Sequence, residues 1–100
     1  MAVVLTCSDP VTTNPGITPV VAEVTNLDPS LVLEVRLWQG GPNDAPSFPS
    51  VGSMTRDPND GAKWNGQVTT MTAGQRKMRA YCTYKTIIES ADKTITVNNP

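Results

Sequence analysis

Apolar and polar side chains alternate with a period of two along several short stretches of this chain. The clearest case is residues 77–85, where every second position is apolar or aromatic: Met78, Ala80, Cys82 and Tyr84. A period of two places successive side chains on opposite faces of a β-strand, so that one face of each strand can be buried. The same alternation predicts strands at residues 2–7, 20–27, 31–38, 63–71 and 93–98, with a weaker one at 51–56.

Proline and turn-forming residues separate these stretches. Proline cannot donate a hydrogen bond to a sheet, so we expect the strands in the segments between the nine prolines. Asp-Pro pairs at 9–10, 28–29 and 57–58 and the Asn-Asp-Gly run at 59–61 are turn signals. Residues 40–50 are rich in Gly and Pro and predict an exposed, mobile loop. Residues 86–93 have the composition of a helical turn that is too short to be stable alone.

Short strands separated by turns predict an all-β sandwich, and 100 residues suffice for a single domain spanning residues 1–100. The alternation places Trp64 on the same strand face as Gly66 and Val68. We therefore predict that Trp64 is buried between the sheets, with four aliphatic residues of other strands near it: Val24, Leu33, Val35 and Ile95.

Composition narrows the range of functions. The net charge of −1 supplies no overall field that would attract nucleic acid or an anionic membrane, and no apolar run approaches the ~20 residues that span a bilayer. Histidine is absent, which removes the commonest general base and metal ligand, and two cysteines alone cannot close a zinc site. The acids of residues 57–61 lack the spacing of a calcium loop and indicate a plain turn. We therefore expect no enzymatic activity, no cofactor or metal, and no binding to nucleic acid or membrane.

The second half of the chain resembles bacterial immunoglobulin-like domains. The resemblance covers residues 57–98 and rests on an Asp-Gly turn at 60–61, Trp64, Gly74, the Ala80-Tyr81 pair and the Thr-Val alternation of residues 94–97. It implies an immunoglobulin-like β-sandwich of about seven antiparallel strands. Domains of this family occur as modules of bacterial surface proteins and as appendages on phage capsids and tails.

The two cysteines lie on the apolar faces of two predicted strands. Cys7 shares a strand face with Leu5, and Cys82 shares one with Ala80, so both thiols can point into the core from opposite sheets. A disulfide between Cys7 and Cys82 would close a long loop and stabilise the fold by roughly 4 kcal/mol. The alternative is two reduced cysteines that pack as small apolar residues. Both alternatives stay open, because the redox state of the compartment decides between them.

The opposite face of residues 77–85 carries residue types that bind partners. Arg79 and Tyr81 alternate there with the apolar positions. In the topology that the resemblance implies, the third strand lies beside the sixth, so Arg36 and Trp38 would share this surface. Exposed Trp, Tyr and Arg are enriched among interface hot spots, so we predict a binding face of Arg36, Trp38, Arg79 and Tyr81. The alternative is a solvated sheet face on which Glu34 pairs with a basic residue of the sixth strand.

The expected function is that of a non-enzymatic structural or binding module. The chain opens at Met1 without the pattern of a signal peptide, and a domain without such a signal can reach the outside on a virion that lysis releases. The resemblance therefore favours a phage decoration or appendage protein on the virion surface, with a capsid or tail protein as its partner. The alternative is a module of a bacterial surface adhesin that binds carbohydrate or protein outside the cell. Attachment through the edge of the first strand is the alternative to attachment through the binding face.

Overall fold

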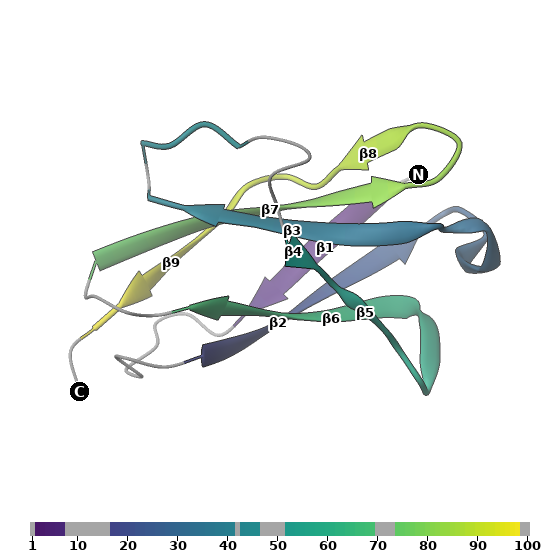
Figure 1. Cartoon of the computed structure of the whole chain (residues 1–100), viewed down its shortest axis with the longest axis horizontal. Coiled ribbons are helices and arrows are strands. Elements are labelled where there is room, and N and C mark those ends of the chain that lie inside the picture. The colour runs from purple at the N-terminus through teal and green to yellow at the C-terminus, as the bar shows by residue number, and fades with distance from the viewer. Residues whose placement is uncertain (1, 8–16, 42, 47–51, 70–73, 99–100) are drawn as a thin grey trace.

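The computed structural model describes residues 2–7, 17–41, 43–46, 52–69 and 74–98, and these residues form two antiparallel sheets (Figure 1). The first sheet has the strand order β1 (Ala2–Cys7), β2 (Ile17–Thr25), β6 (Asp60–Thr69) and β5 (Thr55–Asp57). The second has the order β4 (Gly52–Ser53), β3 (Glu34–Gly40) and β7 (Gly74–Thr83), and both β8 (Ile87–Glu89) and β9 (Lys93–Val97) pair with β7. A 3-10 turn, η1 (Pro29–Leu31), joins β2 to β3. The described chain is all-β, as the alternation of the sequence predicts.

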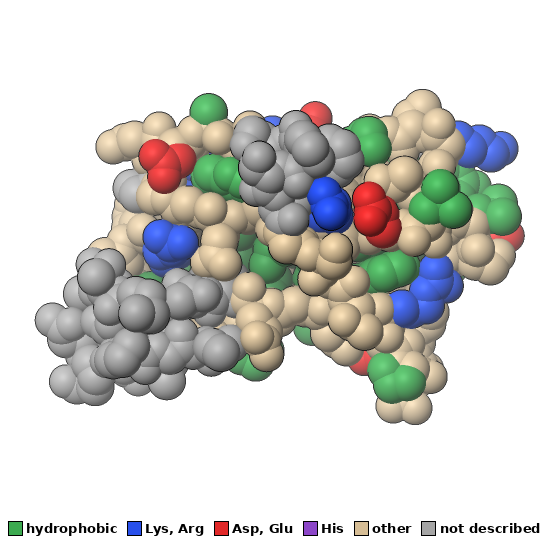
Figure 2. All heavy atoms as spheres, viewed as in Figure 1, with side chains coloured by type: hydrophobic (Ala, Val, Ile, Leu, Met, Phe, Trp, Pro, Cys, Tyr) green, Lys and Arg blue, Asp and Glu red, His purple; other side chains and the backbone are tan. Residues whose placement is uncertain are grey.

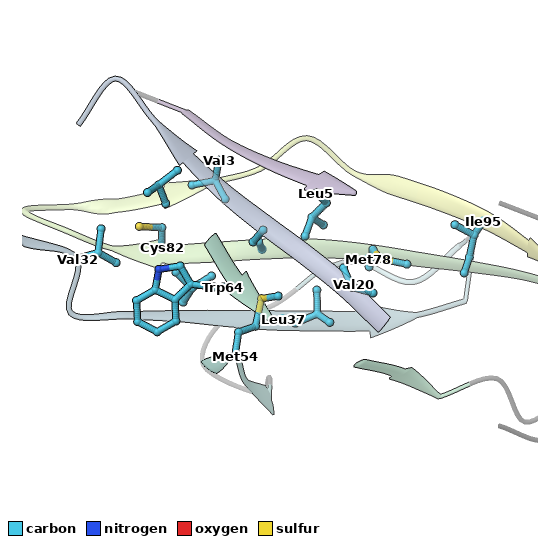
Figure 3. Packing of buried hydrophobic residues seen from close by; sticks show 14 of the residues in the cluster. Val3, Leu5, Val20, Val32, Leu37, Met54, Trp64, Met78, Cys82 and Ile95 are labelled. Carbon is cyan, nitrogen blue, oxygen red and sulfur yellow. The ribbon is translucent and has the colours of Figure 1, made fainter. Parts of the chain in front are cut away.

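The core lies between the two sheets and is built from the alternate apolar positions of the strands (Figure 3). On β7, Met78, Ala80 and Cys82 are each 0% exposed. The other strands contribute in the same way: Val3 and Leu5 from β1, Val20, Ala22 and Val24 from β2, Val35 and Leu37 from β3, and Ile95 and Val97 from β9. Removing this apolar surface from water is the main driving force for joining the sheets. The predicted burial of Trp64 between the sheets is confirmed, and Val24, Val35 and Ile95 belong to the same buried cluster. Ile95 lies at the opposite end of this cluster from Trp64 in Figure 3, so the prediction that it lies near Trp64 is wrong.

Trp64 of β6 closes one end of the core. Its side chain is buried beside Cys82, Leu37 and Met54 in Figure 3. Arg56 lies over the ring with its guanidinium carbon 4.9 Å from the ring centroid, and its Nη2 donates to the Val32 carbonyl oxygen at 2.9 Å. A cation over the face of an indole is attracted to the ring, and here it also covers the ring from water.

The prediction that Leu33 lies in the core is wrong, since 74% of its surface is exposed. Asp28 caps η1 by accepting from the Ser30 amide at 3.0 Å and the Ser30 hydroxyl at 2.7 Å. The hydrogen bonds from Ser30 lower the pKa of Asp28. Because this turn occupies the chain up to residue 31, β3 begins only at Glu34, and Val32 takes the inward position that the alternation assigned to Leu33.

The expectation that strands avoid proline is wrong at Pro19. β2 begins at Ile17 and pairs Pro19 with Gln67 of β6. On the other side of β2, the described part of β1 ends at Cys7, opposite Val20. Pro19 therefore has a described strand on one side only, which is the edge situation that tolerates a residue without an amide hydrogen.

The weakly predicted strand around residues 51–56 crosses from one sheet to the other. Gly52 pairs with Leu37 in the second sheet, and Thr55 pairs with Asn65 in the first. Between them, Met54 is 5% exposed and packs into the core. A β-carbon added to Gly66 would lie 2.9 Å from Met54 Cε, so the glycine makes room for the methionine at this crossing.

Three predicted turns and loops have different outcomes. The plain turn at 57–61 is confirmed, because Asp57 accepts from the Asn59 amide at 2.8 Å and Asp60 accepts from the Ala62 amide at 3.0 Å. The helical turn at 86–93 is wrong: this segment forms β8 and the start of β9. Within 40–50, residue 40 ends β3 and residues 42 and 47–50 lie outside the described residues, so the loop and its mobility stay a prediction.

Candidate binding face

The outer face of the second sheet brings the four predicted binding residues together. β3 pairs with β7 so that Arg36 lies opposite Tyr81 and Trp38 lies opposite Arg79. Side chains that are directly opposite on an antiparallel pair lie within contact distance of each other. The four residues therefore form one group across two strands, which we call the β3–β7 face.

Arg79 is held by two carboxylates from the chain that follows β7. Its Nε donates to Asp92 Oδ1 at 2.6 Å, and its Nη1 donates to Glu89 Oε1 at 2.9 Å. These charge-assisted hydrogen bonds join β7 to both sides of the break between β8 and β9. The Arg79 side chain is 26% exposed, so part of the guanidinium remains accessible from outside.

The same contacts set the charge states of the pair. The hydrogen bond from Arg79 holds the pKa of Asp92 below its usual value, although partial burial opposes this shift. The bond to Asp92 likewise raises the pKa of Arg79. Each group favours the charged form of the other, so both are ionised at neutral pH.

Trp38 lies on the β3–β7 face but is only 7% exposed, so the expectation of an exposed tryptophan here is wrong. Its ring lies against the backbone of Gly40, where an added β-carbon would be 2.7 Å from Trp38 Cζ2. On the neighbouring strand, Lys77 places its Nζ 5.9 Å from the ring centroid. A glycine on one side and a long basic side chain on the other cover an indole that alternation alone assigns to the surface.

Tyr81 is also buried, with 4% of its surface exposed. In the sheet register it lies between Arg36 of β3 and Glu89 of β8. Arg36 pairs with Glu34 of its own strand, with 3.7 Å between Nε and Oε2. Among the described ion pairs, the alternative pairing of Glu34 with a basic residue of β7 does not occur. The β3–β7 face therefore exposes the polar ends of two arginines and their acids, and it buries the two aromatic rings.

Charged side chains are interspersed by sign on the surface. On the face seen in Figure 2, basic and acidic side chains are scattered and do not gather into a patch of one sign. Some form short-range pairs, such as Lys63 Nζ and Asp60 Oδ2 at 3.9 Å. With a net charge of −1, such a surface produces no long-range field that would select a strongly charged partner.

Ser90 is a structural residue that the sequence reasoning missed. It is 6% exposed and sits in the break between β8 and β9. Its Oγ accepts from the Ala80 amide at 2.8 Å and donates to the Ala91 carbonyl oxygen at 3.0 Å, while its own amide donates to the Ala80 carbonyl oxygen at 2.9 Å. The hydroxyl thus accepts the hydrogen bond from the Ala80 amide that a carbonyl of a neighbouring strand would otherwise accept. The signal in the sequence is Glu-Ser-Ala-Asp, which interrupts the alternation between two β-branched runs.

Neither Cys7 nor Cys82 forms a disulfide within the part of the chain that the structure describes. They approach the core from opposite sheets, as the alternation predicts: Cys82 is part of the core and Cys7 packs against it. Cys82 lies near Val32 and Trp64 in Figure 3, whereas Val20, the residue that pairs with Cys7, lies toward Met78. The two thiols therefore enter at different ends of the core, which favours the reduced alternative. Burial raises the pKa of Cys82.

A polar groove follows the rim where the chain crosses between the sheets. One part, of about 150 Å³, is lined by Leu37, Gln39, Gly52, Ser53, Met54, Gly66 and Gln67. The adjoining part, of about 480 Å³, is lined by Ser53, Thr55, Asn65, Gly66 and Gln67. Hydroxyl and amide groups dominate the wider part, so it offers hydrogen bonds and no charge.

Neither a protein-family model nor a curated protein matches the sequence. Within the described ranges, no three His, Cys, Asp or Glu side chains are grouped to hold a metal ion. The described part of the chain also contains no helix that is long and apolar enough to cross a membrane. The strand order and the surfaces of the two sheets are therefore the observations that bear on function.

Proposed function

We propose that this protein is an immunoglobulin-like module that acts by contact and performs no chemistry, as a decoration or appendage protein of a phage capsid or tail. The observation that supports the immunoglobulin-like part of this proposal is the strand order. Immunoglobulin domains place strands A, B, E and D in one sheet and C, F and G in the other. Here β1, β2, β6 and β5 correspond to A, B, E and D, and β3, β7 and the interrupted β8–β9 correspond to C, F and G, with β4 as an added edge.

The fold hosts many binding roles, so the attachment site is argued from the surface. The β3–β7 face supports attachment through polar contacts. Arg79 is fixed by Asp92 and Glu89, and the rings of Trp38 and Tyr81 on the same face are buried. Binding through such a face costs this chain little conformational entropy, because its polar groups are ordered beforehand.

The test is co-sedimentation of the purified chain with phage particles released by the host that encodes it. We expect the chain to sediment with the particles and Arg36→Glu to weaken this association, because a reversed charge on the face opposes the partner. The matched control is Lys63→Glu on the other sheet, which should bind as the wild type does. Equal binding by both variants would show that attachment does not involve the β3–β7 face. A wild-type chain that never sediments with particles would overturn the virion role.

A second candidate function is glycan binding by an adhesin module, and the polar groove favours it. Ser53, Thr55, Asn65 and Gln67 present hydroxyl and amide groups, which match the hydroxyls of a sugar. A glycan array probed with the wild type and with Gln67→Ala tests this role. Specific binding that Gln67→Ala loses would support it, and an array without specific binding would reject it.

A further inference from the structure

The edge strands of the two sheets differ in how well they are protected from pairing with a strand of another chain. Among the described strands, β1, β5, β4 and the interrupted β8–β9 have a neighbour on one side only. β4 is two residues long, and β5 is three residues long with a register shift between Arg56 and Asp57. β8 and β9 are separated by a break, and β9 begins with Lys93. Short length, bulges and charges are the devices by which proteins prevent an edge from pairing with another chain.

β1 has none of these devices. It is six residues long, Ala2–Cys7, and contains no charge and no proline. All six residues pair with β2 without a register shift, from Ala2 opposite Thr25 to Cys7 opposite Val20. In an antiparallel ladder, alternate residues direct their amide and carbonyl groups to the opposite side, so β1 offers hydrogen bonds to a further strand. An uncharged, regular edge of this length can template a new strand.

We propose that β1 is an interaction surface for a second copy of this chain, which adds its own β1 in antiparallel orientation about a two-fold axis. The pairing would join the two four-stranded sheets into one continuous sheet. A two-fold interface requires a surface that is complementary to itself. An uncharged strand meets this requirement, because no like charges are brought together when it faces its copy.

The side-chain pattern restricts the register to those that keep inward residues opposite inward residues, and the exposure of Val4 favours the register centred on Val4. Val3 and Leu5 point into the core, whereas Val4 is 51% exposed and Thr6 is exposed on the outer face. Directly opposite residues in an antiparallel pair point to the same face, so inward residues must meet inward residues. Placing Val4 opposite Val4 of the copy satisfies this rule, because Val3 then meets Leu5. Two exposed valines would be covered at the axis, and the apolar inner face would continue across the junction.

The second sheet also lies close to the edge formed by β1. β1 contacts β8 of the second sheet as well as its own partner β2. The contact between copies would therefore involve both layers of the sandwich close to the axis. A single strand pair buries less than the roughly 1,200 Å² at the lower end of stable interfaces, so we expect a weak, concentration-dependent dimer.

Sedimentation velocity of the full chain over a wide concentration range tests the proposal. We expect the wild type to shift from monomer toward dimer as concentration rises. Val4→Lys and Val4→Glu should each weaken association at least about tenfold, because two like charges would meet at the axis. An equimolar mixture of the two variants should dimerise again, since the introduced ammonium of one copy would then face the introduced carboxylate of the other. The matched control, Thr55→Lys on the exposed β5 edge, should associate as the wild type does.

Each outcome of the sedimentation experiment supports or overturns the pairing of two copies through β1. Thermal unfolding of every variant at the wild-type temperature shows that the fold is intact, which the exposure of Val4 leads us to expect. A wild type that stays monomeric up to its solubility limit overturns the proposal. A dimer that both Val4 variants retain, or a mixture that does not recover association, also overturns it, because the copies then do not meet at Val4. The result is independent of attachment to phage particles, which can succeed or fail separately.

Discussion

Both tryptophans are covered by a long basic side chain, but they have different roles. Trp64 fills the end of the core under Arg56, with 4.9 Å between the guanidinium carbon and the ring centroid. Trp38 lies on the outside of the second sheet under Lys77, and Gly40 gives it room. Each is 7% exposed, so exposure alone does not separate a core residue from a surface residue that its neighbours cover. The difference shows in their contacts, because Trp64 belongs to the core cluster and Trp38 does not.

Trp64→Ala should be strongly destabilising. Deleting a buried large aromatic side chain removes its apolar contacts and leaves a cavity, at a cost of about 3–5 kcal/mol in the free energy of unfolding. Chemical denaturation measures this loss. Leu33→Ala is the control: with 74% of Leu33 exposed, it should change stability by less than about 0.5 kcal/mol. Equal stability of the two variants would contradict the assignment of Trp64 to the core.

Cys7 and Cys82 should remain reduced in the purified protein. Cys7 pairs with Val20, which lies away from Cys82 in Figure 3, and a disulfide requires two α-carbons within about 7 Å of each other. The intact mass should therefore be the same before and after treatment with a reducing agent. A gain of two hydrogens on reduction would show that the cysteines are bonded and that the strands carrying them are placed differently.

β7 organises the second sheet, since it pairs with β3 on one side and with β8 and β9 on the other. The break between β8 and β9 would leave β7 without a regular partner around Ala80. Ser90 fills that gap with its hydroxyl, and Asp92 and Glu89 hold Arg79 beside it. One hydroxyl and two carboxylates thus keep two short strands attached to a single long strand.

Ser90→Ala should lower the free energy of unfolding by about 1–3 kcal/mol. The Ala80 amide is buried and would lose its acceptor, and an unsatisfied buried donor costs its full desolvation penalty. Ser53→Ala, the same change at an exposed position, is the control and should be close to neutral. Thermal or denaturant unfolding compares the two. If both variants match the wild type, the Ser90 hydroxyl does not support β7 as described.

The contact between Arg79 and Asp92 should make stability depend on acid pH. The pKa of Asp92 is lower in the folded chain than in the unfolded chain, so the unfolded chain binds the proton more tightly. The stabilisation is complete above the ordinary carboxyl pKa of about 4 and is lost as pH falls through the lower folded value. Asp92→Asn should therefore be less stable than the wild type at pH 7, by about 1 kcal/mol for a partly exposed pair. The difference should shrink toward zero in acid. A difference that stays constant with pH would contradict this origin.

For the molecule as a whole, periodicity predicted most of the architecture. β1, β7 and β9 appear where alternation is uninterrupted, because one continuous apolar face suffices to define a strand and its buried side. Two of the failures occur where a local hydrogen bond competes with the pattern. The turn capped by Asp28 delays the start of β3, so Leu33 lies on the surface and not in the core. At Ser90, a break between β8 and β9 takes the place of the expected helical turn.

The sequence predicted which residues share the β3–β7 face, but it did not predict that Trp38 and Tyr81 are buried there. The alternation, together with the strand neighbours implied by the resemblance, brings Arg36, Trp38, Arg79 and Tyr81 together, and the register agrees. Periodicity assigns a side chain to a face but does not say which neighbours cover it. The burial of Trp38 depends on Gly40 and Lys77, and the fixing of Arg79 depends on acids 10 and 13 residues away. Such contacts follow from the folded sheet and not from the spacing of one strand.

Quantitative mass spectrometry of density-purified particles released by the encoding host tests whether this chain is a contact-making component of a phage particle. We predict that peptides of the chain co-purify with the particles in a fixed ratio to one major capsid or tail protein across the gradient. Peptides that are absent from the particles and recovered instead from the bacterial cell surface would contradict the account.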